Sequence, residues 1–110
     1  MTKKRFHEIA QEQIKRSLKV LVEKGCEYSF SEDRLDHFKD SAAEQGITPK
    51  QALWGMLSKH LTSLAGLCRT NSNSLERWTE KITDSINYLL LLRALIAEEL
   101  ENEQDSNQNP

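Results

Sequence analysis

Apolar residues recur at intervals of three or four along most of the chain, which is the spacing of an amphipathic helix. No segment alternates apolar and polar residues as a half-buried strand does, and proline occurs only twice. The pattern predicts four helices, over residues 4–24, 31–45, 49–68 and 75–100. We therefore expect an all-α protein that folds as a four-helix bundle.

Glycine and capping residues set the expected helix ends. Gly25 and Gly46 are suited to the left-handed conformation that terminates a helix, and Ser31 is a good N-cap. The third helix has the clearest start, because Thr48 and Gln51 can form a capping box around a proline at the first helical position. In the first helix, the residues expected to face inward are Phe6, Ile9, Ala10, Ile14, Val20 and Leu21.

The end of the chain differs in composition from the rest. From Glu101 onward the sequence ENEQDSNQNP offers no apolar residue to bury, so we expect residues 102–110 to form a disordered acidic tail. The whole chain has 110 residues, of which 37% are hydrophobic. That content is enough for one modest core, so we expect a single helical domain over residues 1–101.

The helix expected at residues 75–100 carries polar and apolar side chains on opposite sides. At about 100° per residue, one side holds a stripe of two carboxylates and an amide, formed by Glu80, Asp84 and Asn87. Burying such a stripe costs several kcal/mol per ion unless a cation or hydrogen bonds meet it. Both sides therefore need covering, and we expect a homo-oligomer. The apolar residues roughly opposite are Trp78, Ile82, Leu89 and Ile96.

The third helix supplies a candidate cation for this acidic stripe. Lys59 shares a side with two glycines and the hydroxyl residues Ser58 and Thr62, where small side chains would permit another backbone or a ligand to approach closely. Lys59 is therefore the expected partner of Asp84 or of a phosphate group. A solvated face with tolerated glycines is the alternative interpretation.

Composition and charge exclude several classes of function. Lysine and arginine total 15 against 17 acids, and the net charge of -2 gives no general attraction to nucleic acid or to an anionic membrane. The longest apolar run, Tyr88 to Leu92, is far shorter than the ~20 residues that span a bilayer. Cys26 and Cys68 lack the spacing of a zinc or redox site. We expect a cytoplasmic protein with reduced thiols and no DNA, RNA or membrane partner.

The sequence gives little support for nucleophilic catalysis. Neither a GxSxG nucleophile elbow nor a GxxxxGK phosphate loop occurs. His7 and His37 have no second ligand four residues on, so we expect both at the surface.

The residues Glu27-Tyr28, Phe38, Gly46 and Lys59, together with EKITDSINYLLLL, resemble a layout found in small bacteriophage and prophage proteins of uncharacterised role. The resemblance covers roughly Gly25 to Glu99. These proteins in turn resemble the all-α nucleotide pyrophosphatases, the MazG and dimeric dUTPase group. Oligomeric bundles of that group hold magnesium and a nucleoside triphosphate with acidic helix motifs.

The resemblance implies nucleotide binding at specific residues. Asp84 matches the aspartate of the second acidic motif, whereas Lys81 stands where that motif commonly has glutamate. The glutamate pair of the first motif is replaced by Lys59 and His60, which argues against hydrolysis. Magnesium, if bound, would be held by Glu80 and Asp84. Enzyme activity is left open.

Two functions remain. In the first, a phage-related helical module in a bacterial host cell binds a nucleotide or similar anion through Lys59, Asp84, Asn87 and Tyr88. In the second, the protein is a non-catalytic, homo-oligomeric structural or interaction protein. Its polar side chains, including Glu80, would then form a satisfied network that fixes helix register.

Overall fold

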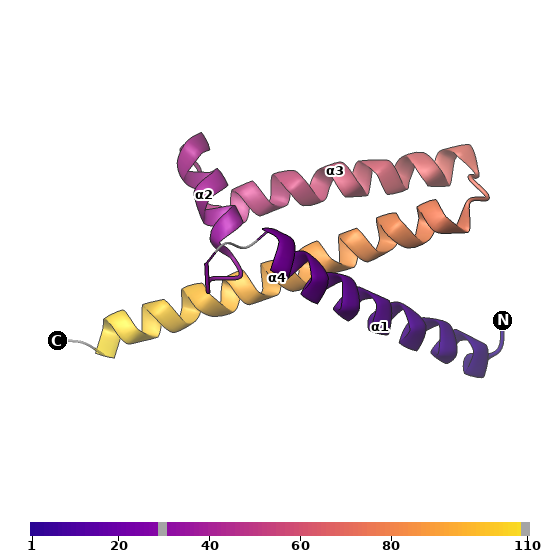
Figure 1. Cartoon of the computed structure of the whole chain (residues 1–110), viewed down its shortest axis with the longest axis horizontal. Coiled ribbons are helices and arrows are strands. Elements are labelled where there is room, and N and C mark those ends of the chain that lie inside the picture. Colours follow the sequence, from indigo (N-terminus) through magenta and orange to yellow (C-terminus); the bar gives the residue numbers. More distant parts are fainter. Residues whose placement is uncertain (29–30, 109–110) are drawn as a thin grey trace.

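The computed structural model describes residues 1–28 and 31–108 of the chain. It contains four helices, which are α1 (Lys3–Tyr28), α2 (Asp36–Gln45), α3 (Pro49–Thr70) and α4 (Leu75–Gln108) (Figure 1). Within those described ranges there is no β-strand. The all-α class and the four helices predicted from the sequence are therefore confirmed.

The core lies where α2 packs against a hairpin formed by α3 and α4. Figure 1 shows α3 and α4 running antiparallel, with α2 across the end of the hairpin that is remote from their connection. The residues on the inner faces recur at helical spacing, so each helix gives one apolar stripe to the core. The buried apolar side chains are Leu35, Phe38, Ala42, Ala52, Leu53, Leu57, Leu67 and Leu95.

The end of α2 and both ends of α3 are capped by the residue types that favour helix termini. Gly46 ends α2 in the left-handed conformation with φ of 68°, as the sequence predicted. The predicted capping box is also confirmed, because the Thr48 hydroxyl accepts from the Gln51 backbone N–H and the Gln51 side chain accepts from the Thr48 N–H. Asn71 closes α3 with φ of 50°, a conformation that asparagine tolerates better than most residues.

α1 crosses α4 through a polar contact. Ser17 and Thr83 are almost fully buried at the crossing. The Gln13 amide nitrogen donates one hydrogen bond to Ser17 Oγ at 3.0 Å and one to Thr83 Oγ1 at 2.9 Å. An amide nitrogen carries two hydrogens, so this small network is satisfied. Toward its N-terminus, α1 diverges from α4 (Figure 1).

This divergence overturns part of the expected inward face of α1. Phe6, Ile9 and Ile14 are exposed, so the prediction that they face the core is wrong. Val20 and Leu21 lie beyond the crossing and are half-buried. Although several apolar side chains are exposed, none of the helices described is both long enough and apolar enough to cross a membrane.

Two predicted helix ends in the N-terminal half are wrong. α1 continues through Gly25 to Tyr28, and α2 begins at Asp36 rather than near Ser31. The Ser31 hydroxyl instead accepts from the Asp33 backbone N–H and donates to the Asp36 carboxylate at 2.7 Å. Serine thus forms a local turn before the helix in place of a helix cap.

The predicted end of α4 near Leu100 is also wrong, because the helix continues to Gln108. The side chains of residues 101–106 are exposed along this extension. The disorder predicted for residues 102–110 is not confirmed over 102–108, and residues 109–110 lie outside the described part of the chain.

Ion pairs at Glu98 and Glu99 join α4 to α2 and α3. Lys39 Nζ contacts the Asp33 carboxylate and lies 2.7 Å from Glu98 Oε1, and Lys50 lies 3.1 Å from Glu99. The hydrogen bond from Lys39 lowers the pKa of Asp33 below its ordinary value. The same hydrogen bond, with that to Glu98, raises the pKa of Lys39.

The molecule is elongated for its length. It measures 57 × 32 × 23 Å, and its radius of gyration is 16.9 Å. A compact domain of this size has a radius of about 13 Å. The excess comes from the divergent half of α1 and the extension of α4, which project from the core at opposite ends (Figure 1).

Two leucines one turn apart on α3 test the position of the core. Leu57 has none of its surface exposed, whereas Leu61 is 39% exposed. We expect Leu57→Ala to lower the free energy of unfolding by about 2–5 kcal/mol, because it leaves a cavity. The matched variant Leu61→Ala should lose less than about half as much, since fewer of its contacts are removed. Urea denaturation of both variants measures the difference, and equal losses would contradict this core.

Candidate functional site

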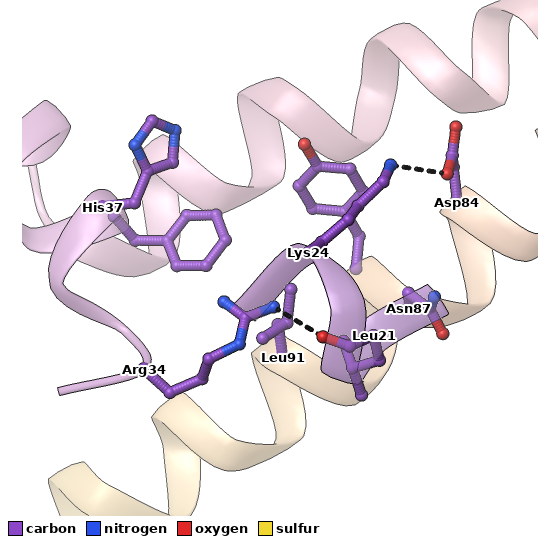
Figure 2. A pocket seen from close by; sticks show the side chains of 9 residues that line it. Leu21, Lys24, Arg34, His37, Asp84, Asn87 and Leu91 are labelled. Atoms are coloured by element: carbon purple, nitrogen blue, oxygen red, sulfur yellow. Dashed lines mark hydrogen bonds and ion pairs between the residues drawn. The ribbon is translucent and has the colours of Figure 1, made fainter. Parts of the chain in front are cut away.

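A pocket of about 230 Å³ opens where the end of α1, the start of α2 and the middle of α4 meet (Figure 2). Its wall combines basic, amide and aromatic side chains with two leucines. The lining residues are Leu21, Lys24, Arg34, His37, Phe38, Asp84, Asn87, Tyr88 and Leu91.

An ion pair between α1 and α4 forms one side of the pocket. Asp84 is only 9% exposed, and its carboxylate lies 3.1 Å from Lys24 Nζ (Figure 2). Lys24 follows Ser17 by seven residues, so the helix crossing places its side chain over α4. His60 Nδ1 lies 3.6 Å from the second carboxylate oxygen, which is too long for a hydrogen bond. Burying a carboxylate costs several kcal/mol unless a cation such as Lys24 reaches it.

Asn87 is the most unusual residue of the pocket. Its side chain follows Asp84 by one helical turn and is 6% exposed. Among the described residues, neither Oδ1 nor Nδ2 of Asn87 has a hydrogen-bond partner. An unpaired buried polar group costs about 1–3 kcal/mol, so native structures seldom contain one without a reason. The Asn87 amide is therefore a donor and an acceptor without a described partner, on a residue that lines the pocket.

Arg34 gives the pocket a second positive charge. Its guanidinium donates to the Leu21 carbonyl oxygen at 3.4 Å, and no described carboxylate pairs with it (Figure 2). The side chain crosses α1 directly at Gly25, where an added Cβ would lie 2.7 Å from Arg34 Nε. Gly25 thus makes room for this arginine within the helix, which explains why glycine there does not act as a cap. His37, at the start of α2, extends the basic wall.

Four aromatic rings run from the pocket toward α3. The ring centroids of His37 and Phe38 are 5.7 Å apart, and those of Phe38 and Tyr88 are 6.3 Å apart, both edge to face. The Tyr88 ring lies 5.0 Å from that of His60. These contacts hold the Tyr88 side chain in place, because buried aromatic pairs favour such geometries.

The structure brings together three of the residues that sequence reasoning proposed for a ligand. Asp84, Asn87 and Tyr88 line the same pocket. Lys59 is exposed on α3 and is not part of that lining, so the cation that contacts Asp84 is Lys24 in place of Lys59.

Glu80, proposed with Asp84 for magnesium, is exposed and outside the pocket. In the part of the chain that the structure describes, no three His, Cys, Asp or Glu side chains lie close enough together to hold a metal ion. The pocket therefore offers basic and amide groups for an anion, and a single carboxylate.

Sequence reasoning missed Lys24, Arg34 and His37. For Lys24 the sequence held one signal. Lys24 lies on the same side of α1 as Ser17 and Gln13, the residues that contact α4. That signal becomes informative only once the crossing at Ser17 is known. Arg34 precedes α2, and its approach to α1 depends on tertiary packing.

Two isosteric substitutions on α4 test whether Asn87 is unpaired. We expect Asn87→Leu to raise the free energy of unfolding of the ligand-free protein by about 1–3 kcal/mol, because an unpaired amide is replaced by an apolar group of similar size. Thr83→Val is the matched control, since Thr83 is equally buried but accepts from Gln13. That variant should lose about 0.5–1.5 kcal/mol. Destabilisation by Asn87→Leu in chemical denaturation would show that the amide is satisfied.

No family model matches the sequence, and no curated protein or solved structure matches it either. The resemblance to bacteriophage proteins and to the nucleotide pyrophosphatase group therefore stays a prediction. The geometry of the pocket carries the functional inference.

Proposed function

We propose that this protein is a helical module that binds a small phosphate-bearing anion, such as the phosphate end of a nucleotide, in the pocket between α1, α2 and α4. The observation that carries the proposal is Asn87, whose buried amide has no partner in the described chain and lies in a wall with two basic side chains.

The anion would be held by charge and by directed hydrogen bonds. Arg34 has a planar guanidinium that suits a phosphate, and no carboxylate among the described residues competes for it. Lys24 is half exposed and its ammonium carries three hydrogens, so it can donate to a ligand oxygen while it stays paired with Asp84. Asn87 would donate to a phosphate oxygen or accept from a hydroxyl group. The Phe38 and Tyr88 rings offer an apolar surface beside the anion.

Binding without hydrolysis fits the side chains at the pocket better than catalysis does. The pocket volume of about 230 Å³ is at the small end for ligand sites, so a nucleotide would leave its base outside or bind in part. A single carboxylate already paired with lysine is a poor magnesium site, since magnesium is usually held by one or two free carboxylates plus phosphate. We therefore propose no reaction.

A structural role is the second candidate, and one observation favours it. The Gln13, Ser17 and Thr83 side chains form a satisfied polar network at the crossing of α1 and α4. Such networks can fix the register of two helices. In this alternative the pocket is a packing defect beside the network and binds nothing.

Calorimetric titration and thermal melting distinguish the two functions. The probes are inorganic phosphate, a nucleoside monophosphate, a nucleoside triphosphate with and without magnesium, and the uncharged nucleoside. A ligand at 100 times its Kd adds about 2.7 kcal/mol of stability, which melting detects readily. We expect the phosphate-bearing probes to stabilise the protein and the nucleoside to have no effect.

Charge-matched variants locate the binding. Arg34→Gln should weaken binding at least about tenfold, because a hydrogen bond to a charged group is worth about 1.5–3 kcal/mol. Lys59→Gln makes the same change in net charge on an exposed residue outside the pocket and should leave the Kd unchanged. Absence of stabilisation by every probe, or equal losses in the two variants, would favour the structural role.

A further inference from the structure

α4 carries an apolar stripe with the spacing of a coiled-coil seam. Leu75, Ile82, Leu89 and Ile96 follow one another at intervals of seven residues, and Leu100 continues the same side. A repeat of seven keeps one face of a helix toward a partner helix over many turns. We call these five residues the apolar stripe.

The chain itself leaves most of the apolar stripe uncovered. α3 packs on the side of α4 that holds Asp84 and Leu95, and α1 packs on the side that holds Thr83. α2 contacts α4 through Phe38, which lies against Tyr88, and Lys39, which pairs with Glu98. The stripe lies on the remaining side, where four of its five residues, Leu75, Leu89, Ile96 and Leu100, are exposed. The helical extension to Gln108 adds length to this surface without contacting the core (Figure 1).

A groove lies beside the first turns of the stripe. It has a volume of about 560 Å³ and separates the divergent half of α1 from α4. The α4 wall contains Leu75, Trp78 and Ile82, and the Trp78 indole N–H is fixed by a 2.7 Å hydrogen bond to the Ser72 carbonyl oxygen. The α1 wall contributes Ile9 with basic and polar groups, namely Arg5, Glu12, Gln13 and Arg16.

We propose that α4 pairs antiparallel with α4 of a second copy of this chain, so that the C-terminal half of each α4 lies in the groove of the other. The twofold axis passes near Leu89. Ile96 and Leu100 of each copy then cover the partner's groove residues, and the divergence of α1 supplies the space for the incoming helix.

Charge fixes the antiparallel direction. The exposed extension of α4 carries Glu101, Glu103 and Asp105. A parallel pair would place these carboxylates against their own copies, which is destabilising. The antiparallel pair places them at the end of the partner's groove that holds Arg5, which Lys3 and Lys4 directly precede in the sequence.

A second copy fits better than an unrelated partner because the surface is complementary to itself. The N-terminal end of the apolar stripe lies beside the groove, which contains Arg5 and Arg16. The C-terminal end of the stripe is followed by the acidic residues of the α4 extension. A twofold pairing brings each end to its complement in both copies, as an isologous interface requires. The exposed α1 residues Ile14, Leu18 and Val22 form a shorter apolar patch without such a complement.

Matched lysine substitutions test the surface in the full chain. Leu89 is 51% exposed and Leu18 is 53% exposed, so neither supports the core and each should tolerate lysine. By light scattering after size exclusion, we expect the native chain and Leu18→Lys to have the mass of a dimer and Leu89→Lys that of a monomer. Circular dichroism checks that each variant is helical. If Leu89→Lys does not fold, Leu100→Lys replaces it, since Leu100 lies in an exposed part of α4.

A monomeric native chain, or a dimer disrupted by Leu18→Lys and not by Leu89→Lys, would overturn the proposal. Direction is measured separately by pulsed electron resonance on Asp105→Cys labelled with a nitroxide, in a Cys26→Ser, Cys68→Ser background. We expect a label separation of about 50 Å, because each label lies about 24 Å of helix from Leu89. Parallel helices would instead bring the labels to about 10 Å plus the length of their arms, which would also overturn it.

Discussion

The ion pair between the buried Asp84 carboxylate and Lys24 joins α1 to α4. Asp84 lies in the face of α4 that packs toward α3, where a charge costs several kcal/mol unless a cation reaches it. Lys24 is that cation, and it reaches Asp84 because α1 crosses α4 at Ser17 and Thr83. The crossing also leaves Asn87 beside a pocket that α1, Arg34 and His37 enclose. The same contact therefore neutralises the charge and creates the site.

The two sides of α4 have different partners. On its polar side, the chain supplies Lys24 and the aromatic rings, and the buried polar atoms left without a partner among the described residues are those of the Asn87 amide and Nδ1 of His60. On its apolar side the described residues leave Leu75, Leu89, Ile96 and Leu100 exposed, and apolar residues repeat every seven positions from Leu75 to Ile96. We propose an anion for the first side and a second copy of the chain for the other. Ligand binding and dimerisation thus use separate surfaces of one helix and can be tested separately.

Helix class and the clearest caps could be predicted from local sequence. Thr48, Gln51 and Gly46 act within a few residues, so their roles depend little on tertiary structure. Gly25 shows the limit, because its role is to admit Arg34, a residue brought there by the fold. The inward face predicted for Phe6 and Ile14 failed for a related reason, since apolar periodicity does not show where α1 crosses α4 and which of its turns are left exposed.

Some candidate site residues could likewise be predicted from local sequence, and others depend on the tertiary structure. Asp84 and Asn87 were found because acidic and amide groups on an apolar helix are visible in the sequence, whereas their neighbours depend on where α1 crosses. The most direct test of that crossing is a double-mutant cycle on Lys24→Met and Asp84→Asn, measured by urea denaturation. We expect a coupling free energy of about 1 kcal/mol, as for a pair with one buried and one half-exposed partner. Additive losses, within about 0.3 kcal/mol, would show that Lys24 does not neutralise Asp84.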